Sequence, residues 1–234
     1  GHIFSLLKLA QGRKDVEVVA ACEEDAETRT ALLRDKSAPI THDNYLRMLD
    51  ETPCDVVAVG DYYGRRGSIM IEALRRGKHV VGDKPICTSL KEIDTIKKLA
   101  AEKNLSVGCQ FDLRDLPKSI AFRNIVLEGR LGEIHAISFN GQHPLNYGKR
   151  PAWYFEPGCH GGTINDIGIH AIDLIPWATG RRFARIDAAR GVQGARRGFV
   201  VLVDFQDTFL QEFAVMIQVF LYPIFLNIAL LRVQ

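Results

Sequence analysis

A carboxylate and an imidazole stand at helical spacing in the second half of the chain. Asp166, His170 and Asp173 occupy positions i, i+4 and i+7, which predicts one face of a helix. Histidine moves protons near neutral pH, and a neighbouring carboxylate can orient it and raise its basicity. A merely solvated polar face is the commoner outcome for such a helix taken alone. The apolar side chains expected to bury on another face are Ile164, Ile167, Ala171 and Ile175.

A lysine after a short apolar strand is the second candidate. Residues 78–85 read KHVVGDKP, a buried strand that ends in Asp83, Lys84 and Pro85. Ligands of open parallel sheets bind at the carboxyl ends of strands, so we expect Lys84 to lie near a ligand. Pro85 fixes its own φ and favours extended backbone at Lys84. The alternative is an ordinary surface lysine.

Together these segments resemble the Gfo/Idh/MocA oxidoreductase family, up to about Phe205. The resemblance implies an NAD(P)-dependent oxidoreductase that transfers hydride between a nicotinamide and a hydroxyl carbon of a sugar, cyclitol or related polyol. It implies that His170 takes the hydroxyl proton, Lys84 stabilises the oxygen, and Asp166 binds substrate and orients His170. The matching stretches are Ala73–Val80, Asp83–Pro85, Gly129–Ile134 and Gly161–Asp173.

Composition agrees with a soluble globular protein. The 234 residues are 47% hydrophobic and 25% charged, and the formal net charge is +2. Basic residues are dispersed without interleaved aromatics, so we expect no nucleic-acid partner. Five cysteines without a Cys-x-x-Cys favour reduced thiols in a cytoplasmic protein. Cys159-His160 has no second pair at metal spacing, so we expect no metal.

Alternating strands and helices predict a Rossmann-type domain over residues 1–114, with a parallel sheet covered on both faces. Gly77 should follow a helix as its cap, and Ser89 with Glu92 should form a capping box. The expected strands are Val16–Cys22, Cys54–Val59, His79–Val81 and Leu105–Cys109. The expected helices are Ile3–Gln11, Asp25–Leu33, Tyr45–Asp50, Ser68–Arg76 and Ser89–Lys103.

Glu23 is the expected ribose ligand of the cofactor. It follows the first expected strand, where dinucleotide-binding folds place a carboxylate against the ribose hydroxyls. Glu24 stands where NADP would require an arginine, so NAD is favoured over NADP. Alternatively, both acids merely begin a helix. The resemblance implies further cofactor-binding residues, namely Gly1 as the last glycine of a phosphate-binding turn, Asp61, Asp83, Lys84 and Pro85.

The chain departs from the family pattern in several places. The family's first strand and Gly-rich turn should precede Gly1, so we expect weak dinucleotide binding and an unpaired edge exposing Val18 and Val57. Asp83 replaces the family's glutamate. Asp61–Gly64 replaces a Thr-Pro-Asn and histidine pattern, which leaves the contacts to nicotinamide open.

Residues 115–234 predict an α+β domain with an open-faced, mostly antiparallel sheet, which the resemblance makes the substrate and oligomer domain. Aromatic residues in the irregular stretch 141–157, Trp153 first among them, should line a substrate pocket. The expected helices are Leu116–Leu127 and Gly161–Gly180. The expected strands are Glu133–Gln142, Phe183–Gly191 and Gly198–Phe205.

Phe209–Val233 is almost entirely apolar. A membrane span would fit its length, but polar residues such as Glu212 would be costly in hydrocarbon, so we expect no membrane association. Further sheet strands and out-of-frame sequence stay open. With both ends short, we expect the chain to be inactive alone and to form a homo-oligomer through its C-terminal sheet.

Two other functions stay open. One is a glycosidase that uses bound NAD for transient oxidation and elimination. The other is a non-catalytic protein of the same fold that binds sugar or dinucleotide.

Overall fold

The computed structural model describes residues 2–142, 146, 148–192, 198–205 and 214–220. The chain forms two compact units. The first contains Gly1–Phe111 and Trp153–Gly161, and the second contains Asp112–Ala152 and Gly162–Gln234. The return of Trp153–Gly161 to the first unit was not indicated by any sequence pattern.

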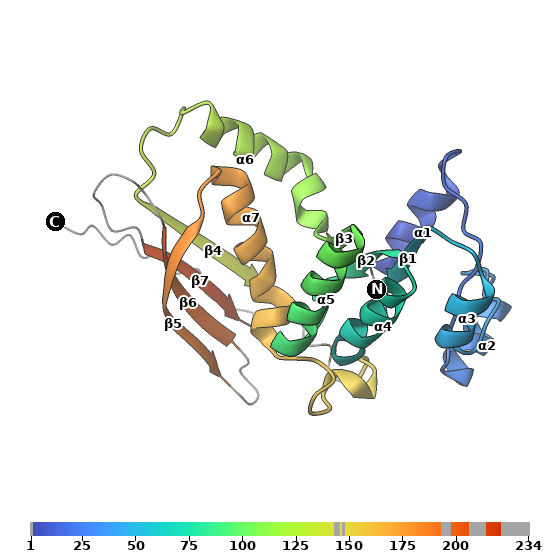
Figure 1. The fold of residues 1–234 in the computed structure, drawn as a ribbon. Coiled ribbons are helices and arrows are strands. Elements are labelled where there is room, and N and C mark those ends of the chain that lie inside the picture. The colour runs from blue at the N-terminus through green and yellow to red at the C-terminus, as the bar shows by residue number, and fades with distance from the viewer. Residues whose placement is uncertain (1, 143–145, 147, 193–197, 206–213, 221–234) are drawn as a thin grey trace. The chain divides into compact units, whose positions relative to one another are not determined.

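A parallel sheet forms the centre of the first unit, in the order β1-β2-β3 (Figure 1). Its strands are β1 (Val56–Val59), β2 (His79–Asp83) and β3 (Val107–Gln110). The register sets Asp83 beside Gln110 at the carboxyl end of the sheet. The predicted Rossmann-type parallel sheet is therefore confirmed.

Helices α4 and α5 pack against each other, and α4 packs on β1 and β2. Met70, Ala73 and Leu74 of α4 are fully buried and form the centre of the core with Val80 and Ile96. Gly77 follows α4 with a φ of 75°, as predicted for a C-terminal cap. The helices of this unit are α1 (Ile3–Gln11), α2 (Ala26–Arg34), α3 (Tyr45–Glu51), α4 (Tyr63–Arg75) and α5 (Leu90–Lys103).

The predicted strand Val16–Cys22 is wrong. This segment makes a single parallel bridge, from Cys22 to His42, with a hydrogen bond from the Thr41 N–H to the Ala21 carbonyl of 2.9 Å. Among the described residues, 16–20 have no ladder partner, and a strand requires one. Val16 and Val19 are 45% and 47% exposed.

Burial along β1 alternates. Val57 and Val59 are buried, whereas Val56 is 54% exposed. The prediction that both faces of the sheet are covered is therefore wrong at β1, as is the prediction that Val57 is exposed. The reason is the two-residue period of a strand, which turns Val57 toward the core under α4. Among the described residues, β1 pairs with β2 along one edge.

Two local predictions at α4 and α5 are also wrong. Helix α4 begins at Tyr63 instead of Ser68. The predicted start was too late because Gly64 and Gly67 lower the helix propensity of this stretch, where they are needed for close packing. Ser89 is the N-cap of α5, but its side chain makes no capping hydrogen bond. The Glu92 carboxylate lies over Gly67 of α4, where an added β-carbon would be 2.3 Å from Oε2. Burial there raises the pKa of Glu92.

The second unit contains a four-stranded sheet in the order β4-β7-β6-β5. Two of its pairings, β5 with β6 and β6 with β7, are antiparallel, and β4 with β7 is parallel. The predicted mostly antiparallel sheet is confirmed. The strands are β4 (Ala136–Gln142), β5 (Phe183–Val192), β6 (Gly198–Phe205) and β7 (Ala214–Phe220).

Helices α6 (Pro117–Leu127) and α7 (Ile169–Thr179) pack together beside this sheet (Figure 1). Strand β7 lies within the apolar segment Phe209–Val233, so part of that segment is sheet. Residues 209–213 and 221–233 lie outside the described residues. Among the described helices, none has the length and apolar character needed to cross a membrane.

Gly64 lets the segment Trp153–Gly161 dock on the start of α4. Its N–H donates to the Cys159 carbonyl at 2.8 Å. A β-carbon at Gly64 would lie 2.2 Å from the Gly158 carbonyl oxygen, so only glycine permits this approach.

We predict that Gly64→Ala displaces this segment and lowers the free energy of unfolding by about 1–3 kcal/mol, because the added methyl overlaps backbone. The displacement should change the emission of Trp153, whose ring centroid lies 5.2 Å from that of Tyr63. Fluorescence and denaturant melts in a Trp177→Phe background isolate this signal. Gly12→Ala is the control, since a β-carbon there would meet nothing closer than 3.6 Å. Equal emission and equal midpoints in both variants would contradict the prediction.

Candidate functional site

The turn after β2 holds the predicted lysine in a buried position. Asp83 and Lys84 are 2% and 5% exposed, and the peptide bond between Lys84 and Pro85 is cis. Lys84 is therefore not an ordinary surface lysine. It follows directly from the strand whose end the sequence marked as ligand-binding.

A buried guanidinium, which sequence reasoning missed, holds this turn. Nη1 of Arg66 donates to the carbonyl oxygens of Asp83, Lys84 and Pro85, at 3.1, 2.7 and 3.2 Å. Nη2 lies 3.4 Å from Oδ2 of Asp83, and Nε donates to the Asp61 carbonyl at 2.6 Å. One side chain thus binds three successive carbonyl groups of the turn and the end of β1.

Arg66 is 3% exposed, and burial lowers its pKa although the Asp83 carboxylate opposes that shift. Removing one member of such a buried pair costs about 3–5 kcal/mol, because the other charge stays buried without compensation. Arginine in the first turn of a helix is electrostatically disfavoured. Its presence there is the sequence signal that could have revealed this role.

The N-terminus of α1 lies at the carboxyl end of β1. The Ile3 side chain packs on Gly60, where an added β-carbon would be 2.6 Å from the Ile3 Cβ. A helix N-terminus at the carboxyl ends of parallel strands favours a phosphate, so these residues fit the pyrophosphate of a dinucleotide. Gly1, predicted to belong to the phosphate-binding turn, lies outside the described residues.

A second arginine joins two acidic segments at this end of the sheet. Arg65 donates through Nη2 to the Glu24 carboxylate and through Nη1 to Oδ2 of Asp61, the latter at 3.1 Å. Glu24 also accepts the Tyr45 N–H at 3.1 Å. Burial acts to raise the pKa of Glu24, but the hydrogen bonds from Arg65 and Tyr45 outweigh it and leave the pKa below its usual value.

Glu23 lies at the start of α2. Its Oε1 accepts the N–H of Asp25 at 2.9 Å, and Asp25 in turn caps the helix by accepting the Thr28 N–H at 2.7 Å. Arg29 donates to the carbonyl oxygens of Glu23 and Glu24. These contacts agree with the alternative that Glu23 and Glu24 begin a helix. The binding of ribose by Glu23 stays a prediction.

Aromatic rings surround the start of α4. Trp153 lies 6.1 Å from Tyr62 and 5.2 Å from Tyr63, measured between ring centroids. Tyr63 in turn lies beneath the Arg66 guanidinium, at 4.5 Å, and beside the ring of His160 at 5.1 Å. The structure thus brings Trp153, the predicted substrate-binding residue, into the same unit as the Lys84 turn.

The helix with Asp166 and His170 differs from the expected one. It begins with a π-helical turn, Ile164–Gly168, that leads into α7. Gly161 and Gly162 have φ values of 74° and 91°, so they lie outside the helix that was expected to begin at Gly161. Asp166 is 3% exposed, so it is buried and does not lie on a solvated face. Ile167, Ala171 and Ile175 are buried as predicted, and Ile164 is half-buried.

Asp173, the third member of the predicted polar face, is used structurally. It accepts the Nε–H of Arg114, in the short helix η1 (Asp112–Asp115), at 2.7 Å. Asp166 and His170 belong to the second unit and Lys84 to the first. The convergence of these three residues on one substrate stays a prediction.

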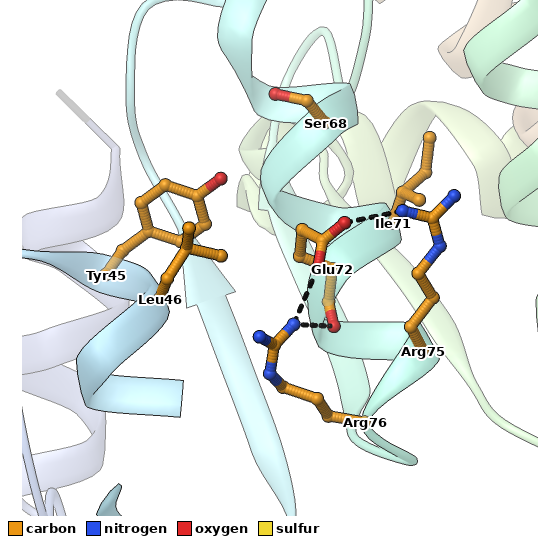
Figure 2. A pocket seen from close by; sticks show the side chains of 7 residues that line it. All are labelled: Tyr45, Leu46, Ser68, Ile71, Glu72, Arg75 and Arg76. Atoms are coloured by element: carbon orange, nitrogen blue, oxygen red, sulfur yellow. Dashed lines mark hydrogen bonds and ion pairs between the residues drawn. The ribbon is translucent and has the colours of Figure 1, made fainter. Parts of the chain in front are cut away.

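A hollow of about 460 Å³ between α3 and α4 holds none of the predicted site residues (Figure 2). Glu72 accepts hydrogen bonds of 2.6 Å from both Arg75 and Arg76, and Arg76 also binds Asp50. The charges in this hollow satisfy one another, which indicates a structural role. Its lining residues are Tyr45, Leu46, Ser68, Ile71, Glu72, Arg75 and Arg76.

The cysteines are free thiols, and burial raises the pKa of Cys22 to about 11. A thiol with so high a pKa is a poor nucleophile at neutral pH. In the parts of the chain that the structure describes, no group of three or more His, Cys, Asp or Glu side chains could hold a metal ion.

Comparison with known proteins matches both units to one family. Residues 4–111 match the "Oxidoreductase family, NAD-binding Rossmann fold", and residues 120–218 match the "GFO/IDH/MocA C-terminal domain". The myo-inositol 2-dehydrogenase structure from Lactobacillus plantarum superposes with a TM-score of 0.76 at 21% identity, covering 94% of this chain and 66% of that one.

Two curated relatives are similar in sequence. Levoglucosan dehydrogenase of Pseudarthrobacter phenanthrenivorans is 25% identical over 60% of this chain and 37% of its own length. The 1,5-anhydro-D-fructose reductase of Ensifer adhaerens is 26% identical over 85% of this chain and 63% of its own length. The chain therefore spans less than two thirds of these relatives. Since the two family matches together cover most of the sequence, the chain belongs to the Gfo/Idh/MocA family of oxidoreductases.

Proposed function

We propose that the protein is a nicotinamide-dependent dehydrogenase acting on a hydroxyl carbon of a sugar, cyclitol or related polyol. The main observation that supports this proposal is that Arg66 holds Lys84 in a fixed, buried turn at the carboxyl end of β2. The N-terminus of α1 lies at the same end of β1, where parallel sheets bind dinucleotides. The two curated relatives are named for levoglucosan and 1,5-anhydro-D-fructose, which supports a sugar-like substrate.

Four side chains take part in the proposed reaction. The nicotinamide cofactor, when bound, supplies the acceptor for the hydride that leaves the substrate carbon. His170 takes the hydroxyl proton on a ring nitrogen, and the Lys84 ammonium donates a hydrogen bond to the same oxygen. Asp166 orients His170 and binds substrate hydroxyls, and Trp153 offers an apolar face to the ring. Loss of one hydride and one proton converts the alcohol to a ketone.

We predict that His170→Ala lowers kcat by about 10²–10⁴ with little change in melting temperature, because it removes the general base. NADH formation with a panel of sugars and inositols measures the effect. His135→Ala is the control, since the His135 side chain is 64% exposed. An undiminished kcat, or an equal loss in the control, would remove His170 from the mechanism. Release of sugar without net NADH would instead indicate the NAD-using glycosidase.

The three catalytic candidates must also meet at one substrate. We expect an experimental structure of a ternary complex to show the Lys84 ammonium and the His170 ring at the same hydroxyl. A separation of more than about 10 Å between them, well beyond reach through one water, would end the assignment.

The cofactor is expected to be NAD in preference to NADP, with Glu23 accepting the ribose hydroxyls. Glu23→Ala should lower kcat/KM for NAD by about 10- to 100-fold, the worth of hydrogen bonds to a charged group. The value for NADP should change less, because its 2′-phosphate gains nothing from the carboxylate. Glu27→Ala, at an exposed acid in the first turn of α2, is the control. If the ratio of kcat/KM for NAD to kcat/KM for NADP were unchanged in Glu23→Ala, Glu23 would have no role in binding the ribose.

A homo-oligomer through the β4–β7 sheet, a cytoplasmic location and the lack of a nucleic-acid partner also stay proposals. Sedimentation measurements on the protein test the first of these.

A further inference from the structure

We propose that Arg65 and Glu24 together set the cofactor preference, because Glu24 occupies the guanidinium that would otherwise bind a 2′-phosphate. The inference rests on the proposed function, since it concerns a dinucleotide at the carboxyl end of the first sheet. The residues it names, Arg65 and Glu24, are distinct from Glu23, whose proposed role is to bind the ribose.

The pair lies where the adenosine end of a dinucleotide is recognised. Glu24 follows the segment that ends at Cys22, and Asp61 follows β1, so Arg65 joins the carboxylates that follow two segments of the unit. Dinucleotide-binding folds distinguish NAD from NADP at this position, with a carboxylate for the ribose hydroxyl or an arginine for the phosphate. The chain has both kinds of residue here, and they are bound to each other.

The guanidinium is accessible to a ligand. The Arg65, Glu24 and Asp61 side chains are 29%, 26% and 28% exposed. The neighbouring Arg66 contrasts with them, because it is 3% exposed and its donors bind backbone carbonyls. Of the two adjacent arginines, Arg65 is therefore the one whose guanidinium could exchange Glu24 for a ligand.

The charges explain why the exchange does not favour phosphate. The Arg65 guanidinium binds two carboxylates, those of Glu24 and Asp61, and Glu23 adds a third carboxylate next to Glu24 in the sequence. A 2′-phosphate would have to displace Glu24 from Arg65 and approach the remaining carboxylates. The Tyr45 N–H binds Glu24 at 3.1 Å, and the Arg65 guanidinium lies 5.3 Å from the Tyr45 ring centroid, so Tyr45 contacts both partners and favours their pairing. Phosphate and carboxylate bind the same planar fork of arginine, so removing Glu24 opens a phosphate site.

The test compares binding of NAD and NADP by calorimetry, without turnover. Glu24→Gln should raise the affinity for NADP relative to NAD by about 10-fold or more, because it removes a negative charge and releases Arg65. Adding Arg65→Ala to this variant should abolish the gain. The gain should also shrink as salt is added, as expected for an exposed charge pair. Arg65→Ala alone should strengthen the preference for NAD.

Glu27→Gln is the matched control, since it removes the same charge from the exposed first turn of α2. A second guanidinium, that of Arg29, donates to the Glu23 and Glu24 carbonyls nearby, so Arg29→Ala is tested in the Glu24→Gln background as well. The proposal is overturned by an unchanged preference in Glu24→Gln, by a gain that survives Arg65→Ala, or by a gain that Arg29→Ala abolishes instead. If the unaltered protein binds neither dinucleotide, the proposed function itself fails, which is a distinct result.

Discussion

The buried charge of Arg66 is the constraint on which the first unit depends. A guanidinium that is 3% exposed must have acceptors, and it finds them in the carbonyls of residues 83–85, the Asp83 carboxylate and the Asp61 carbonyl. These contacts fix the start of α4 to the ends of β1 and β2 together. The position of Lys84 follows, because its backbone is bound on both sides by the same side chain.

Arg65 and Arg66 are adjacent on α4 but have different surroundings. Successive residues point about 100° apart on a helix, so Arg66 turns into the sheet while Arg65 faces the rim. Arg66 binds three successive carbonyl oxygens of a buried turn. Arg65 binds carboxylates that water or a ligand can also reach. Arg66 fixes the turn that holds Lys84, and Arg65 is the residue that we propose distinguishes the cofactors.

Close packing explains why local rules misplaced the elements around this turn. Gly64 and Gly67 lower the helix propensity of 63–67, yet that stretch is helical. Glycine is required at both positions because Gly158 and Glu92 approach where no β-carbon fits. The same contact draws Glu92 away from the capping box expected at Ser89. In the second unit, the positive φ values of Gly161 and Gly162 delay the start of the helix, whose first turn is π-helical and contains the buried Asp166.

Sequence alone determined the parallel and mostly antiparallel sheets, most helix boundaries, and the positions of Asp83, Lys84 and His170 within their elements. These depend on local periodicity and on motif residues a few positions apart. Tertiary structure decided what no local pattern contains. It gave residues 16–20 no ladder partner in the described part of the chain, returned Trp153–Gly161 to the first unit, and joined Arg65 to Glu24 across 41 residues of sequence. Such pairings depend on which charges share a buried or half-buried space, and that space exists only once the chain has folded.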